Sequence, residues 1–404
     1  MDKAIDFDVA RNLLLSYVIP VTTETVPLLE SAGRILADDL CALESVPPFD
    51  RSPYDGYALR ASDTVCASKD HPVALRILEE VPAGAVPTKP VTPMTATKIL
   101  TGAPIPEGAD TVIPYEFTHF TAEAVTIFEQ KESGSHIVKA GENICKGQLL
   151  ASKGTCIDTG LIGTFASQGV AAPLVYRRPL VGIISTGNEI VEMTESLVPG
   201  KIRNSNRYTL TAALKIIGCD SLYLGIAGDS PEEIAALITK GLNQCDALLL
   251  TGGVSVGDYD FTPVAMDKAG VKILVHGINM KPGMACAYGF KNEKLVCGLS
   301  GNPASSLTNF YAVAQPVLKK LAGRADCLPE EVTITLKHTF KKKSPVTRLL
   351  QGKLDLSDGI VTLVCPKDQE NVVLSNTVGC NAMGIVPAGS GPLSAGTKLK
   401  GFII

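Results

Sequence analysis

One block of the chain, from Leu180 to Lys320, alternates strand-like and helix-like segments, and this alternation constrains the fold more than any other feature. Apolar runs such as LVGIIS, SLYLGIA and ALLLT are followed by polar turns and then by segments with helical spacing of apolar residues. Strands and helices that alternate in this way predict right-handed βαβ units in a doubly wound parallel sheet. We therefore expect an α/β domain here.

Short polar motifs follow several of the predicted strands. Ligands of open α/β sheets bind beyond the carboxyl ends of the strands, where such motifs meet at one edge. We therefore expect them to form one binding site. The motifs are STGNE at 185–189, GDSP at 228–231, TGGVSVGDYDF at 251–261 and SGNP at 300–303.

The stretch from Ala247 to Phe261 carries the strongest local signal, because a leucine-rich strand leads directly into Thr251-Gly252-Gly253. Glycines let the backbone approach a ligand closely and aim its N–H groups at an anion. Asp258 and Asp260 follow, and two carboxylates beside an anion would repel it unless a divalent cation lies between them. The stretch also fits a tight turn with solvated aspartates, so both interpretations stay open here.

The other parts of the chain predict three further domains or layers. Helical patterns over Asp6–Tyr17 and Pro27–Leu40 predict a helical layer, and short β-type runs separated by Pro and Gly predict an inserted β-rich module. The C-terminal runs have the spacing of a small barrel or sandwich. The expected fold is therefore α/β multidomain: a helical layer (1–45 and 146–178), an inserted β-rich domain (46–145), the doubly wound sheet domain (179–326) and a C-terminal β-barrel-like domain (327–404).

Two loops of the β-rich module carry more chemistry than a turn needs. The loop VPPFDRSPYDGYALR spans Val46–Arg60 and includes Asp55, while LTGAPIPE at 100–107 begins with Leu100-Thr101. Asp55-Gly56 also fits a simple turn pair, and Thr101 fits either an oxyanion contact or a turn cap.

Composition excludes several classes of function. The 404 residues are 45% hydrophobic and 19% charged with a net charge of −4, so nothing suggests nucleic acid or a membrane as partner. The acidic N-terminus is unlike a signal peptide, and no apolar run reaches the roughly 18 residues of a membrane span. Eleven cysteines without a CxxC pair favour reduced thiols over disulfides or zinc. We expect a cytoplasmic protein.

Taken together, the motifs resemble those of the molybdopterin molybdenumtransferase family, whose eukaryotic relatives include the gephyrin E domain. The resemblance covers nearly the whole chain. It implies a Mg²⁺-dependent enzyme that inserts molybdate into adenylylated molybdopterin, cleaves the pyrophosphate bond and releases AMP. It also implies a homodimer with a composite active site, and transient contact with the adenylyltransferase and with molybdoenzymes. The matching segments are PYDGYALR at 53–60, ILTGAPIPEGAD at 99–110, STGNE, GDSP, TGGVSVGDYDF, MKPG at 280–283 and GLSGNP at 298–303.

The resemblance also assigns roles to individual residues. Catalytic roles fall on Asp55, Glu189, Asp229 and Asp260, and the last two are expected to face the metal. Molybdate contacts fall on Lys281, Arg348 and Ser375. Substrate contacts fall on Thr101, Ser185, Thr186, Gly187, Thr251, Gly252, Gly253, Ser255, Lys281, Pro282, Gly301, Asn302 and Pro303.

The chain departs from the family pattern at the anion site. Gly277 stands where relatives often carry a second lysine, and Val138 stands where some carry arginine, so we expect weaker molybdate binding. Two other functions stay open, an adenylyltransferase and a non-catalytic molybdopterin-binding scaffold. Tungstate also remains possible as the oxyanion.

Overall fold

The computed structural model describes residues 4–255, 260–357, 359–366 and 373–404. The chain divides into two compact units, each described here by itself. Unit 1 comprises residues 1–38, 153–162 and 171–404, and unit 2 comprises residues 39–152 and 163–170. Within the described residues, no helix has both the length and the apolar character needed to cross a bilayer.

A six-stranded sheet forms the centre of unit 1. The strands β15, β12, β16 and β20 are parallel neighbours, so the doubly wound sheet predicted from the sequence is confirmed. In sheet order the strands are β15 (Asp220–Ala227), β12 (Leu180–Thr186), β16 (Ala247–Thr251), β20 (Lys294–Leu299), β19 (Ala287–Lys291) and β17 (Lys272–His276).

Strand β19 interrupts the parallel order of this sheet. β19 is antiparallel to β20, and β17 is antiparallel to β19. The turn between β19 and β20 consists of Asn292 and Glu293, which have φ angles of 49° and 65°. Two central residues with positive φ make a hairpin turn, and such a turn forces antiparallel pairing. β17 therefore runs in the same direction as β20, and the β19–β20 hairpin is an addition to the predicted βαβ units.

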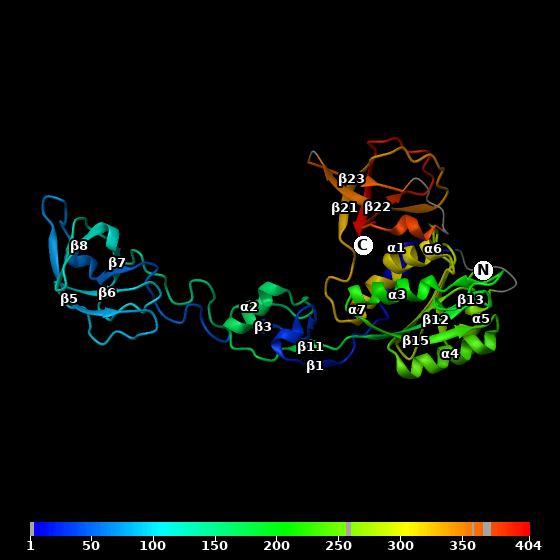
Figure 1. Ribbon diagram of the computed structural model, residues 1–404, viewed down its shortest axis with the longest axis horizontal. Helices are drawn as coiled ribbons and strands as arrows, with labels where there is room; N and C mark the ends of the chain where they lie inside the picture. Colours follow the sequence, from blue (N-terminus) through cyan, green and yellow to red (C-terminus); the bar gives the residue numbers. More distant parts are fainter. Residues whose placement is uncertain (1–3, 256–259, 358, 367–372) are drawn as a thin grey trace. The chain divides into compact units, whose positions relative to one another are not determined.

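Helices cover both faces of the sheet (Figure 1). Side chains of β16 point alternately to the two layers: Leu249 packs in one core, and Leu248 and Leu250 pack in the other. The first layer contains α1 (Phe7–Leu15), α3 (Ser205–Ile216), α6 (Pro303–Asn309), a π-helical turn (Phe310–Ala314) and α7 (Gln315–Leu321). The second layer contains α4 (Pro231–Gln244) and α5 (Thr262–Lys268).

Local sequence signals start the helices next to the sheet edge. The Ser230 hydroxyl accepts a hydrogen bond from the Glu233 N–H at 3.3 Å, and Pro231 is the first residue of α4. The Glu233 carboxylate accepts a bond from the Gly228 N–H at 3.0 Å. Asn204 caps α3 by accepting from the Arg207 N–H at 3.2 Å. The Ser230 and Asn204 side chains thereby satisfy first-turn N–H groups that a helix leaves without partners.

The C-terminal part of unit 1 is a closed barrel, which confirms the predicted barrel-like domain. Five strands pair in a ring, and the short strand β18 (Met280–Lys281) adds to its β22 edge. The barrel strands are β21 (Glu331–Leu336), β22 (Thr347–Ser357), β23 (Ile360–Val364), β24 (Ala382–Val386) and β25 (Lys398–Ile403), with a 3₁₀ turn at Leu374–Thr377.

The N-terminal layer is less helical than the sequence predicts. The segment Pro27–Leu40 was expected to form a helix, or a helix and a turn. It forms a 3₁₀ turn (Leu28–Ser31), strand β2 (Ile35–Leu36) and the first residue of β3 (Leu40–Cys41). Gly33 breaks the helical pattern with a φ of 73°. Strand pairing then replaces the helix, because β11 (Leu174–Tyr176) lies between β2 and β1 (Thr23–Thr25). The helix α2 spans Thr159–Ser167.

Unit 2 contains the predicted β-rich insertion. Its six-stranded sheet packs around Tyr57, Leu59, Leu75 and Val125, all of which are fully buried. The strand order is β7 (Thr111–Pro114), β4 (Gly56–Leu59), β6 (Thr95–Ile99), β5 (Val73–Val81), β9 (Ala124–Ile127) and β8 (Thr118–Phe120), and β10 (Leu149–Ala151) pairs separately with β3. Short 3₁₀ turns occur at Ala61–Thr64 and Tyr115–Phe117.

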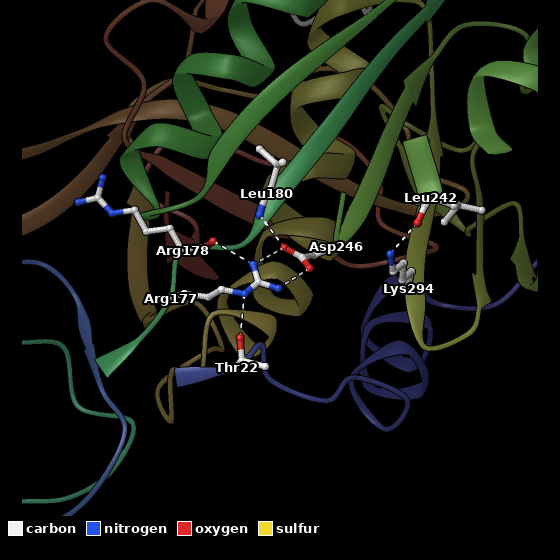
Figure 2. A network of polar contacts seen from close by, with 7 residues as sticks. All are labelled: Thr22, Arg177, Arg178, Leu180, Leu242, Asp246 and Lys294. Atoms are coloured by element: carbon white, nitrogen blue, oxygen red, sulfur yellow. Dashed lines mark hydrogen bonds and ion pairs between the residues drawn. The ribbon is translucent and has the colours of Figure 1, made fainter. Parts of the chain in front are cut away.

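A partly buried ion pair fixes the start of two central strands in unit 1 (Figure 2). Arg177 donates two hydrogen bonds of 2.6 Å to Asp246, and Asp246 also accepts from the Leu180 N–H at 2.8 Å. Arg177 Nε donates to the Thr22 hydroxyl at 3.0 Å. Burial alone would raise the pKa of Asp246, but the hydrogen bonds from Arg177 and Leu180 outweigh it and hold this pKa below its ordinary value.

We expect Asp246→Ala to lower the free energy of unfolding by about 2 kcal/mol, because it leaves the half-buried Arg177 without its partner. A group with a lowered folded-state pKa stabilises above its unfolded pKa and loses this effect as the pH falls. The stability difference from the unaltered protein should therefore shrink below about pH 4. Urea unfolding across pH tests this, with Asp267→Ala at an exposed position of α5 as the control. A difference that is small at pH 7 or that grows in acid would contradict the prediction.

Candidate functional site

A pocket of about 810 Å³ lies at the carboxyl end of the parallel strands, where the sequence places the site. Thr186 is the last residue of β12, Thr251 the last of β16, and Ser300 follows β20. All four predicted motifs contribute to its lining. The residues of these motifs that line the pocket are Ser185, Thr186, Gly187, Glu189, Asp229, Thr251, Gly252, Gly253, Ser255, Asp260, Ser300, Gly301, Asn302 and Pro303.

The Gly252-Gly253 turn brings two strand ends into close contact. Gly252 has a φ of 103°, and a Cβ there would lie 2.6 Å from Thr186 Oγ1 and 2.8 Å from its carbonyl oxygen. The Gly252 N–H donates to the Leu299 carbonyl at 3.0 Å. This N–H therefore bonds within the sheet and does not face an anion, and phosphate contacts from the rest of the Thr251-Gly252-Gly253 turn stay a prediction. The Thr262 hydroxyl donates to the Gly252 carbonyl at 2.8 Å and ties the turn to α5.

One wall of the pocket comes from the start of α3, which the sequence reasoning missed. Strands β13 (Ile190–Val191) and β14 (Ile202–Arg203) pair beside it, and Arg203, Asn204 and Asn206 line the pocket. Asn206 Nδ2 donates to the Gly301 carbonyl at 2.8 Å, which joins this wall to the SGNP motif. An Asn cap after a basic residue at a strand-to-helix junction was the available signal.

Asn204 is the buried anchor of this wall. Its Nδ2 atom donates to the Ser185 hydroxyl at 2.9 Å and to the Tyr223 hydroxyl at 3.1 Å. Burial is the main cause that raises the pKa of Tyr223, to about 12, so this hydroxyl stays neutral. The Arg207 guanidinium stacks 3.8 Å from the centre of the Tyr223 ring. These contacts fix the start of α3 against the end of β12.

Among the described residues, three carboxylates line the same pocket: Glu189, Asp229 and Asp260. Asp229 Oδ2 accepts a long bond of 3.4 Å from the Asn188 N–H. A side chain at Gly187 would collide with the Glu189 carboxylate, so Gly187 makes room for it. No group of three or more His, Cys, Asp or Glu with metal-binding geometry occurs in the described residues. Asp258, the other acidic residue of the loop, lies outside the described residues.

The residues predicted to contact molybdate lie apart from this lining. Lys281 and Arg348 are paired in register on the neighbouring strands β18 and β22, so the structure brings these two cations together. Arg348 Nε is buried without a hydrogen-bond partner among the described residues, and its guanidinium lies 5.6 Å from the Phe340 ring. Ser375 follows Leu374, which lines the pocket. Pro282 follows Lys281 through a cis peptide bond.

A second cavity of about 730 Å³ adjoins the pocket, and both are lined by Val254, Ser255, Ala285, Ser300 and Asn302. Its other wall includes His276, Gly277 and Met284. Gly277 has a φ of 79°, and its N–H donates to the Cys286 carbonyl at 2.8 Å. Glycine at position 277 therefore suits a backbone with positive φ, and it also lacks the positive charge that a lysine would supply there.

We expect Gly277→Ala to lower the free energy of unfolding by about 1 kcal/mol, because an L residue is strained at positive φ. Space is not the cause, since a Cβ here would lie 3.8 Å from its nearest neighbour atom. Gly277→Asn is the matched control and should lose less, because Asn tolerates this conformation better. Urea unfolding measures both. An alanine variant as stable as the parent would remove the backbone explanation.

In unit 2, the two predicted loops meet. Asp55 Oδ1 accepts hydrogen bonds from the Thr101 N–H at 2.7 Å and from the Thr101 hydroxyl at 2.8 Å. These bonds lower the pKa of Asp55 below its ordinary value, so this exposed carboxylate stays ionised. Thr101 thus holds Asp55. Val138 pairs with Arg51 through backbone hydrogen bonds of 2.9 and 3.0 Å.

Comparison with known proteins identifies the family. Residues 5–169 match the MoeA N-terminal region (domain I and II), and residues 182–320 match a probable molybdopterin binding domain. The molybdopterin molybdenumtransferase of Bacillus subtilis is 35% identical over 388 residues, covering 95% of this chain and 90% of that protein. The chain belongs to the molybdopterin molybdenumtransferase family.

Further relatives agree with this family. The molybdopterin molybdenumtransferase of Staphylococcus epidermidis is 34% identical, covering 96% of this chain and 92% of that protein. The crystal structure of the molybdopterin biosynthesis MoeA protein of Pyrococcus horikoshii OT3 superimposes with a TM-score of 0.86 and 29% identity, covering 100% of both chains. The resemblance inferred from the sequence is confirmed, and with it the prediction of a transferase of molybdenum cofactor biosynthesis.

Proposed function

We propose that this enzyme inserts molybdate into adenylylated molybdopterin, with cleavage of the pyrophosphate bond and release of AMP. The observation that supports this most is the pocket at the strand ends, where three carboxylates, a helix start and Gly-containing turns converge. The adjoining cavity extends it, which suits a long substrate with a nucleotide end and a pterin end.

Asp229 and Asp260 would hold Mg²⁺ in this pocket. Two carboxylates that line one pocket fit the donor set of Mg²⁺, which is usually bound through one or two carboxylates plus substrate phosphates. The bound ion supplies charge neutralisation on the pyrophosphate. Without it, these carboxylates would repel the substrate.

The residues of the chain itself bind and orient the substrate. Arg203 and the N–H groups at the start of α3 favour a phosphate group, because a helix N-terminus carries partial positive charge. The Asn206–Gly301 hydrogen bond keeps the two walls in register around it. Asn302 and Pro303, at the start of α6, line the same pocket. Glu189 faces the same space and positions the reacting part of the substrate.

Molybdate, the second substrate, would be held by Lys281 and Arg348. Both are cationic and are paired in register on adjacent strands. The buried Nε–H of Arg348 has no acceptor among the described residues and could donate a hydrogen bond to the anion. Ser375 would add a hydroxyl from the barrel. Tungstate has the same charge and shape class, so this arrangement does not discriminate against it.

Asp55 would complete the site in a homodimer. The Thr101 hydrogen bonds keep it ionised on the surface of unit 2, where it makes a carboxylate available to a second subunit. A two-fold dimer would then have two composite sites, each with residues from both chains.

Removing both metal-facing carboxylates should stop turnover. We expect Asp229→Asn with Asp260→Asn to lower the rate of AMP release at least about a hundredfold, because the pyrophosphate loses its neutralising ion. EDTA should abolish AMP release in the unaltered enzyme, and added Mg²⁺ should restore it. The control is Asp267→Asn on α5, which should keep full activity. Activity that persists in EDTA would refute the metal assignment.

Mixing two inactive variants tests the composite site. Asp55→Ala and Asp260→Ala should each lose activity, and random subunit exchange should restore about one quarter of the original rate. Half of the dimers are then mixed, and each mixed dimer has one complete site. Affinity tags on the two variants report the exchange. No recovery after proven exchange would place Asp55 in the site of its own chain.

A further inference from the structure

A basic pocket lies at the opposite, amino end of the same sheet. It has a volume of about 330 Å³ and lies where β12 begins and α3 ends. None of the described residues that line it is acidic. Five of its lining residues are cationic: Arg34, Arg177, Arg178, Lys215 and Arg324.

Three of these arginines are held in place by carboxylates outside the lining. Arg34 pairs with Glu24 and donates to the Tyr176 carbonyl at 2.9 Å. Arg177 makes its bidentate pair with Asp246. Arg324 donates to Asp326 at 3.0 and 2.6 Å. A paired guanidinium has five N–H donors in a fixed fork, so these pairs leave donors available in defined positions.

The other two cations have no such partner. Neither the Arg178 guanidinium nor the Lys215 ammonium makes a hydrogen bond or an ion pair with the described part of the chain, and Arg178 points away from Asp246 in Figure 2. Both side chains are exposed. Lys215 also lies in the last turn of α3, where a cation favours the helix dipole. That role does not explain why Arg178, Arg34 and Arg324 surround the same cavity.

We propose that this pocket binds a small, multiply charged oxyanion of the phosphate class. Arginine forks and a lysine charge are the groups that proteins use for phosphate, and two positive charges here are uncompensated. The cavity has room for a small anion. The site is separate from the catalytic pocket, because β12 and α3 each run from one pocket to the other, with Ser185 and Asn206 at the far end.

Calorimetric titration with inorganic phosphate at constant ionic strength tests the proposal on the full chain. We expect Arg178→Gln with Lys215→Gln to weaken phosphate binding at least about tenfold, because two charge-assisted contacts are lost. The matched control, Lys240→Gln with Lys398→Gln, removes the same charge from exposed positions elsewhere in unit 1. The control should bind phosphate as the unaltered protein does.

Three results would overturn the proposal: no phosphate binding by the unaltered protein up to about 20 mM, unchanged binding by the double variant, or an equal loss in the control. Unchanged binding would place the phosphate in the catalytic pocket or elsewhere. Circular dichroism checks that the double variant is folded. If it is not, the single changes Arg178→Gln and Lys215→Gln are titrated separately, and the same criteria apply to them.

Discussion

The structure of unit 1 depends on strand β16, which is buried along its whole length between two helical layers. A strand with apolar side chains on both faces needs helices on both sides, and this excludes ligands from the faces of the sheet. The strand ends at Thr251 in a turn at Gly252, where an added Cβ would lie 2.6 Å from Thr186 Oγ1. The position of the candidate pocket is therefore a consequence of how this strand is packed.

The same constraint explains why acidic residues meet at this edge. Asp229 and Glu189 follow β15 and β12, and Asp260 precedes α5, so all three carboxylates converge because parallel strands end together. Carboxylates next to a pyrophosphate are unfavourable unless a cation separates the charges. At the amino end of the sheet, the Arg177–Asp246 pair instead fixes the strand starts, and an excess of basic side chains remains.

Much of the fold was predictable because the signals were local. The leucine-rich β16, the Ser230-Pro231 helix start and the alternating runs after Glu331 each specify their own element. The predictions that were wrong depended on longer-range partners. Pro27–Leu40 has helical spacing, yet Gly33 and pairing with β11 decide its structure. The Gly252 N–H was one of those expected to face an anion, but it donates a hydrogen bond to the Leu299 carbonyl. The α3 wall of the site escaped notice because Asn206 and Gly301 meet only in the folded chain.

The central claim is that the pocket couples molybdate insertion to AMP release. The most direct measurement incubates the enzyme with adenylylated molybdopterin and Mg²⁺, with and without molybdate, and quantifies AMP together with pterin-bound molybdenum. The account predicts that AMP and pterin-bound molybdenum appear in equal amounts and that both depend on molybdate. Formation of AMP without any pterin-bound molybdenum, or no AMP under any condition, would contradict it.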